Sequence, residues 1–216
     1  MGGESGNDKV NNIFNKGVTT EDVKYTSYAL KEASKSLGVS TDYVLYMMYP
    51  TTTKGLVDQE QVFKDNVEFV KSISPTSVVI SPLAAFYGAD VFEKKEEYGI
   101  TVDESYNIVM PLFEYTAYLP KQFWKKIYYS IENLSFDQIV NEITRFTKKC
   151  ISEGILTDIA DEQVILARVA GFDGKKGLAD FYFKTLNDLV SCSQGNLKDI
   201  QLKFNEKSRK IALENF

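Results

Sequence analysis

The chain has 216 residues, of which 44% are hydrophobic and 25% are charged, and its formal net charge is −5. This composition excludes a disordered or collagen-like chain and allows one large domain or two small ones. A negative net charge argues against a general nucleic-acid binder, which usually carries a basic face. We therefore expect no nucleic-acid partner.

Cysteine and histidine set further limits. The chain has no histidine and two cysteines, Cys150 and Cys192, so histidine-dependent catalysis is excluded and a disulfide framework cannot form. We expect both thiols to be buried packing groups in a reducing compartment. No segment approaches the roughly 20 apolar residues that span a bilayer, and the polar N-terminus lacks a signal peptide. The sequence thus predicts a cytoplasmic protein without a membrane partner.

The first half of the chain has an alternating pattern of helices and strands. A short helix is expected between Asn7 and Gly17, and a second helix opens at the capping pair Thr19 and Asp22 and ends before Gly38. Near-continuous apolar runs at 43–49 and 77–81 predict strands buried on both faces. A helix over 58–72 lies between them, so this region predicts a parallel βαβ unit.

The second half predicts mainly helices. They are expected over about 136–153, 158–170 and 178–191, and from 196 to near the C-terminus. The aromatic residues Phe123, Trp124, Tyr128 and Tyr129 have the spacing of one buried helix face, and packing is the favoured interpretation over a substrate pocket. The predicted fold class is α/β, with an α/β region at 1–118 and a helical domain at 119–216.

The N-terminal segment has the most specific pattern in the sequence. Gly2 and Gly3 allow a backbone to approach a ligand closely. Glu4 could accept hydrogen bonds from a ligand diol, and Lys16 could pair with a ligand carboxylate. An exposed loop followed by an ordinary capped helix is the alternative, because Gly, Ser and Asn clusters usually mark loops.

Three segments in series resemble one protein family. They are Gly-Glu-Ser-Gly-Asn-Asp-Lys-Val with Asn-Lys-Gly-Val-Thr-Thr-Glu-Asp-Val, then residues 65–71, and then residues 77–83. Together they resemble the radical S-adenosylmethionine (SAM) enzymes, in the branch often fused to a cobalamin-binding domain. The likeness covers roughly residues 2–98.

The resemblance implies the second half of a partial (β/α)6 barrel, with strands five and six, followed by the helical C-terminal region. It also implies SAM, bound beside a 4Fe–4S cluster that cleaves it to a 5′-deoxyadenosyl radical. The cluster motif of the family, C-x-x-x-C-x-x-C, is absent from this chain. We therefore expect a fragment that lacks the N-terminal half of its barrel and is inactive alone, with the cluster and any cobalamin confined to the full-length protein.

The resemblance also suggests cofactor-binding residues. Glu4 matches a position that commonly contacts the SAM ribose, and Lys16 matches one that commonly meets its carboxylate. Ser5 is a polar neighbour. Asp42 matches an often acidic position but ranks lower, because it precedes its strand and a solvated strand start is the favoured interpretation.

The two turns that should face the active site depart from the family pattern. One is Tyr49-Pro50-Thr51-Thr52-Thr53, where the family usually has P-G-x-T, and the other is Phe86-Tyr87-Gly88-Ala89, where it often has Y-P-G-T. Because of these departures, the resemblance gives little support for contacts with substrate or cofactor at these turns. Catalytic residues and the substrate cannot be assigned from this sequence.

Two functions remain open. One is a fragment of a radical SAM enzyme that performs reductive SAM cleavage or cobalamin-linked methyl transfer. The alternative is a non-enzymatic binding or scaffold module with a degenerate half barrel and a helical interaction domain. Because a half barrel should expose the edge of strand 43–49, we also expect self-association into a homo-oligomer through that edge.

Overall fold

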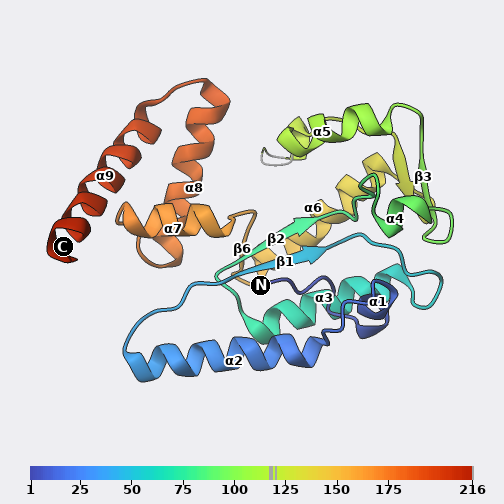
Figure 1. Ribbon diagram of the computed structural model, residues 1–216, viewed down its shortest axis with the longest axis horizontal. Coiled ribbons are helices and arrows are strands. Elements are labelled where there is room, and N and C mark those ends of the chain that lie inside the picture. The colour runs from blue at the N-terminus through green and yellow to red at the C-terminus, as the bar shows by residue number, and fades with distance from the viewer. Residues whose placement is uncertain (117–118, 120, 216) are drawn as a thin grey trace. The chain divides into compact units, whose positions relative to one another are not determined.

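The computed structural model describes residues 1–116, 119 and 121–215. Within it the chain divides into two compact units, Met1–Asp158 and Ile159–Phe216. Both the helices and the strands of this mixed α/β fold are visible in Figure 1. The boundary predicted between residues 118 and 119 falls inside the first unit, because the elements on either side of it share one core.

The first unit contains most of the elements. Its helices are α1 (Asp8–Ile13), α2 (Thr20–Leu37), α3 (Gln59–Ile73), α4 (Asp90–Glu93), α5 (Tyr106–Thr116) and α6 (Phe136–Ser152), with a 3₁₀ turn at Lys121–Phe123. Its strands are β1 (Val44–Met48), β2 (Ser77–Ser81), β3 (Ile100–Val102), β4 (Tyr129–Ile131), β5 (Leu134–Ser135) and β6 (Leu156–Thr157).

The predicted βαβ unit is confirmed. β1 and β2 are adjacent and parallel, with Val44 opposite Ser77 and Met48 opposite Ser81, and α3 connects them. β6 continues the sheet in parallel beside β2, so the strand order β1-β2-β6 follows the chain order. The strand predicted from the apolar run at 43–49 is present as β1, and its residues Val44, Leu45 and Met47 are all buried.

The edge of β1 is paired, contrary to the sequence prediction that it would be exposed. Gly2 forms a parallel bridge with Tyr46. The Gly3 N–H donates to the Tyr46 carbonyl at 2.9 Å, and the Met48 N–H donates to the Glu4 carbonyl at 2.7 Å. The N-terminal segment, for which an exposed loop was one interpretation, is therefore extended, and it satisfies backbone groups which an open edge would leave to solvent or to another chain.

Helices cover one face of the parallel sheet more fully than the other. α3 packs against both α2 and α6, and α6 also contacts β2 and β6. Leu45, Met47, Val78 and Ile80 alternate along β1 and β2 and are buried. The residues between them are less buried: Tyr46, Met48 and Val79 are intermediate and Ser81 is exposed. The prediction of burial on both faces is thus only half correct, because side chains of a strand alternate between its faces.

The region after residue 118 contains strands as well as the helices that the sequence predicted there. β4 and β5 form an antiparallel sheet with β3, which precedes this region, and β6 joins the parallel sheet. The aromatic residues expected on one helix face do not share a helix. Tyr129 lies in β4 with 5% of its surface exposed, whereas Phe123 and Tyr128 are 47% and 57% exposed.

The second unit is helical, as expected. It contains α7 (Asp161–Val169), α8 (Gly174–Ser191) and α9 (Gly195–Asn215), and each of these helices contacts the other two. The buried Asp188 carboxylate accepts hydrogen bonds from the Leu197 N–H and the Asn196 amide, which fixes the start of α9. Among the described residues, we found no helix with both the length and the apolar character needed to cross a membrane.

Candidate functional site

The carboxyl ends of the parallel strands bring several polar groups to one edge of the sheet. Glu4 lies at the end of the N-terminal segment. The threonine loop, which contains Thr51, Thr52 and Thr53, follows β1, and the segment after β2 runs from Pro82 to Ala89. Asp158 directly follows β6, and its carboxylate lies 3.0 Å from the Lys121 ammonium group. Open α/β sheets usually bind their ligands at this edge, so these segments form the candidate site.

Glu4 and Lys16, the two residues for which the sequence suggested contacts with a ligand, form an ion pair at this edge. The Lys16 Nζ lies 3.0 Å from Glu4 Oε1, and the two side chains are 45% and 29% exposed. The short helix α1 brings them together. It is capped by the Asn7 side chain, which accepts the N–H groups of Lys9 and Val10. The pair is accessible, so a ligand with a hydroxyl and a carboxylate could exchange for the internal contact.

Ser5 is buried and forms hydrogen bonds within the protein. Its side chain is 1% exposed, and its hydroxyl donates to Asn66 Oδ1 of α3 at 3.0 Å. The same amide oxygen accepts the Gly6 N–H at 2.6 Å. Ser5 therefore joins the N-terminal segment to α3, and its role as a polar neighbour of a ligand stays a prediction.

Packing explains two of the three glycines of the motif. A Cβ atom on Gly6 would lie 2.7 Å from the Asp65 carbonyl and 3.0 Å from the Asn66 Cα. A Cβ atom on Gly3 would lie 2.6 Å from the Leu45 side chain, whereas one on Gly2 would meet only the Glu4 side chain at 3.9 Å. At Gly3, therefore, the close approach that the sequence suggested for a ligand is made by a side chain of β1.

Asp42 is not part of this group. It precedes β1, and its carboxylate accepts a hydrogen bond of 3.1 Å from Thr76 Oγ1, just before β2. Both residues mark the amino ends of their strands, which is the opposite end of the sheet from Glu4. The lower rank given to Asp42 agrees with this position.

Glu132 was missed by the sequence analysis. It lies in the turn between β4 and β5, yet its carboxylate reaches the loop after β1. There it accepts the N–H groups of Thr53 and Lys54 at 2.6 and 2.7 Å and the Thr52 hydroxyl at 2.9 Å. The Gln59 amide donates at 3.2 Å. Residues 52–54 of this loop thus provide donors that converge on a carboxylate of the same chain.

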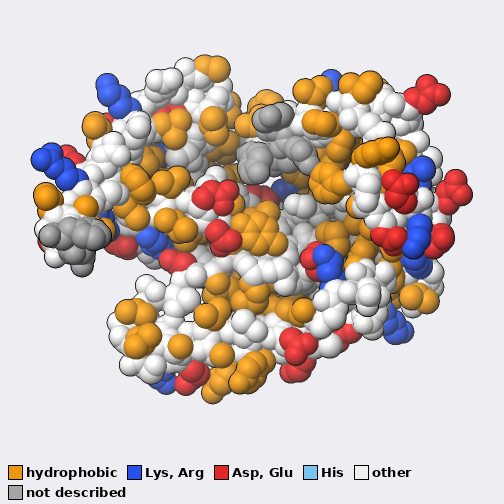
Figure 2. Space-filling view, viewed as in Figure 1, with side chains coloured by type: hydrophobic (Ala, Val, Ile, Leu, Met, Phe, Trp, Pro, Cys, Tyr) orange, Lys and Arg blue, Asp and Glu red, His pale blue; other side chains and the backbone are white. Residues whose placement is uncertain are grey.

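The second unusual turn, after β2, lines a cavity. Ala85, Phe86 and Tyr87 form one side of it, and residues of α5 form the other. Figure 2 shows hydrophobic side chains gathered on the surface over α5 and the neighbouring elements at the upper right. The sequence identified the residues of this turn, but it did not predict their contact with α5.

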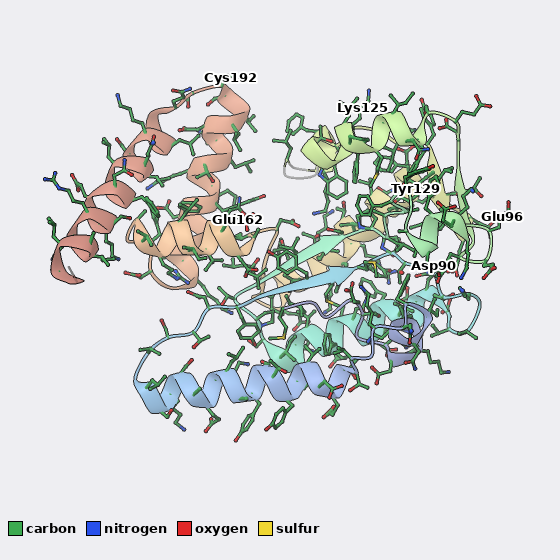
Figure 3. The ribbon with its side chains drawn as sticks, in the orientation of Figure 1. Asp90, Glu96, Lys125, Tyr129, Glu162 and Cys192 are labelled. Carbon is green, nitrogen blue, oxygen red and sulfur yellow. The ribbon has the colours of Figure 1, made fainter. Side chains whose placement is uncertain are left out.

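The two cysteines have different environments. Cys150 is buried in α6, and burial raises the pKa of its thiol to about 12. Cys192 lies at the turn between α8 and α9 (Figure 3) and is exposed, so the prediction that both are buried is wrong for Cys192. Cys192 is the C-cap residue of α8 and has a left-handed backbone conformation.

The residues present do not fit a 4Fe–4S cluster, which takes thiolate ligands from several cysteines. Cys150 and Cys192 belong to different compact units. Within the described part of the chain, no three Cys, Asp or Glu side chains are grouped so that they could hold a metal ion.

Comparisons with protein-family models, with curated proteins and with solved structures found no match for this chain.

Proposed function

We propose that this chain is part of a radical SAM enzyme and that its first unit is an arc of the SAM-binding barrel. The observation that carries the proposal is the order of its parts. The N-terminal segment, β1, β2 and β6 are neighbours in chain order and parallel, and the helices that connect them, α2, α3 and α6, contact one another in a row. Successive βα units of a barrel have this arrangement.

The uneven burial of the sheet supports the same assignment. In a β/α barrel the helices cover the outer face, and the inner face and the carboxyl ends of the strands surround the site. Here Leu45 and Met47 are buried, whereas Tyr46 and Met48 on the opposite face are only partly covered. Glu4 and Lys16 lie at the carboxyl edge of this sheet.

In this proposal Glu4 and Lys16 hold SAM. The Glu4 carboxylate accepts hydrogen bonds from the ribose hydroxyls, and the Lys16 ammonium group pairs with the methionine carboxylate. Both are charge-assisted contacts. When bound, SAM supplies the carbon that becomes a 5′-deoxyadenosyl radical, or the methyl group in a cobalamin-linked transfer. The cluster belongs to the part of the protein that carries the three-cysteine motif.

A binding or scaffold module is the second candidate, and one observation favours it. The charged and polar groups of the carboxyl edge are satisfied by one another: Glu4 pairs with Lys16, and Glu132 accepts the donors of the threonine loop. Under this alternative these contacts only hold the unit together, and no small-molecule cofactor exchanges for them.

The decisive experiment concerns the gene. The enzyme proposal requires the gene to encode C-x-x-x-C-x-x-C about 100 residues before Met1, a length that fits half of such a barrel. After anaerobic reconstitution, the longer protein should cleave SAM to 5′-deoxyadenosine. An upstream region without that motif would refute the enzyme assignment and favour the module.

The role of the pair is tested in that longer protein. Lys16→Met should weaken SAM binding about tenfold, as expected when one partner of a charge-assisted contact is lost. Lys24→Met is the matched control, because Lys24 forms a similar exposed ion pair with Glu21 on α2. Equal SAM affinity in both variants would show that Lys16 does not contact the cofactor.

A further inference from the structure

A cavity of about 490 Å³ opens beside the segment that follows β2. Its volume lies within the range of small-molecule sites, and it borders the carboxyl edge of the parallel sheet. The residues that line it come from two segments and are Ala85, Phe86, Tyr87, Tyr106, Asn107, Met110 and Pro111.

One wall of the cavity is rigid. Tyr106 is 1% exposed, and its hydroxyl accepts a hydrogen bond of 3.1 Å from the Ala85 N–H, which joins α5 to the segment after β2. Its ring lies 6.4 Å from that of Phe92 and 5.8 Å from that of Tyr129. The wall is therefore in place before any ligand arrives, which reduces the entropy lost on binding.

The rim of the cavity exposes two aromatic side chains to solvent. Phe86 and Tyr87 are adjacent aromatic residues, and they are 50% and 80% exposed. The Tyr87 ring makes an edge contact with Phe92, with the ring centroids 5.4 Å apart. Contiguous exposed apolar surface of this kind marks binding sites, and two exposed rings beside a rigid aromatic wall can stack on a flat ligand.

The polar groups of the cavity lining restrict the chemical class of ligand further. None of the lining residues that the structure describes is charged, so these residues offer no counter-ion to an ionised ligand. The Asn107 side-chain amide provides one donor group and one acceptor group. We propose that this cavity binds a neutral, planar aromatic or heteroaromatic ring, which packs against the exposed rings of Phe86 and Tyr87 and forms a hydrogen bond with Asn107. This site does not depend on the SAM proposal, since it uses neither Glu4 nor Lys16.

The experiment titrates the whole chain with indole, adenosine and cyclohexanol, using saturation-transfer NMR. Indole represents a free aromatic compound, adenosine represents a nucleoside, and cyclohexanol is neutral but not planar. We expect indole to bind more tightly than cyclohexanol. Tyr87→Ala should weaken ring binding about fivefold, the usual effect of losing one aromatic contact. Because Tyr87 is mostly exposed, this change should not unfold the chain, and thermal melting checks that point.

The matched control is Tyr25→Ala, which removes a tyrosine that is 73% exposed on α2 and does not line the cavity. Indole should also bind more tightly than N-methylindole, and Asn107→Ala should remove that advantage because it removes the hydrogen-bond acceptor. Binding of adenosine without indole would also support the site and assign it to nucleosides.

Three results would overturn the proposal. They are no detectable binding of either ring compound, cyclohexanol binding as tight as that of the rings, and equal effects of Tyr87→Ala and Tyr25→Ala.

Discussion

The carboxylate of Glu132 accepts a hydrogen bond of 2.6 Å from the backbone N–H of Thr53, across 79 positions of sequence. This contact joins the β4–β5 turn to the loop after β1. Glu132 holds a left-handed backbone conformation with φ of 47°, which is unfavourable for a residue with a long side chain. The hydrogen bonds at its carboxylate compensate for that conformation and fix the loop at the carboxyl edge of the sheet.

We predict that Glu132→Ala lowers the free energy of unfolding by about 3 kcal/mol, because the donors of Thr52, Thr53 and Lys54 lose their charged acceptor. Glu132→Gln should cost less, since its amide oxygen can still accept. Urea denaturation measures both. Glu104→Ala removes an exposed glutamate before α5 and serves as the control. A loss in Glu132→Ala no larger than in this control would show that the contact does not hold the loop.

The second prediction distinguishes packing from ligand approach at the N-terminal glycines. Gly6→Ala should destabilise the first unit by about 2 kcal/mol, because the added methyl group meets the backbone of α3 and neither helix nor segment can yield easily. Gly2→Ala is matched in chemistry, and its nearest contact would be the Glu4 side chain at 3.9 Å. Thermal melting should separate the two variants. Equal melting temperatures would mean that the segment does not pack on α3 as described.

Periodicity and capping signals predicted the βαβ unit well. The ends of α2 follow from Thr19 with Asp22 at its start and Gly38 at its end, where the structure has a full capping box and a left-handed glycine. α6 is equally well marked by Ser135 and Gln138. In each case the signal lies within a few residues, so it depends little on the tertiary fold.

The missed elements depend on distant partners. β6 has two residues, and it becomes a strand only because it lies beside Ser77 and Val78. The N-terminal segment is extended because Tyr46 and Met48 pair with it, although its Gly and Ser content is typical of a loop. The cavity and the Glu132 contact likewise join segments far apart in sequence. Local patterns contain no information on such pairings.

A third prediction concerns self-association, which the sequence linked to an open edge at β1. Since residues 1–4 pair with that edge, contacts through it are not expected in the chain as it stands. A variant lacking residues 1–4 should expose the N–H and C=O groups of β1 and form dimers or larger species. Light scattering at several concentrations compares the two chains. The idea fails if the shortened chain has the same mass as the original at every concentration.

A fourth prediction is that this chain acquires no 4Fe–4S absorbance after anaerobic reconstitution with iron and sulfide. Cys150 is buried, so two cysteines offer one accessible thiol, whereas a cluster needs several thiolates. A ferredoxin that binds a 4Fe–4S cluster through four cysteines is the positive control for the reconstitution. Stoichiometric iron on this chain, lost in Cys192→Ser, would contradict the prediction.

The last prediction follows from the Cys150 thiol. Burial raises its pKa in the folded chain from the ordinary value of 9.0 to about 12. The unfolded chain therefore releases this proton at a lower pH than the folded chain does. Below pH 9 the thiol is neutral in both states, and its contribution to stability is fully present. Between pH 9 and 12 the unfolded state binds fewer protons, so stability falls as the pH rises, by up to about 1.4 kcal/mol per pH unit for one group.

Cys150→Ala should remove this part of the alkaline destabilisation while it lowers stability at neutral pH, because it leaves a small cavity in the α6 core. Urea denaturation of both chains at pH 7 and pH 10.5 measures the difference between them. Burial also raises the pKa of the Tyr49 and Tyr129 hydroxyls, so both chains should lose stability in alkali, and only the difference reports on Cys150. Cys192→Ala provides the control, since that thiol is exposed. If the Cys150→Ala chain and the unchanged chain lose equal stability between the two pH values, the thiol ionises as readily in the folded state as in the unfolded one, and α6 does not shield it from water.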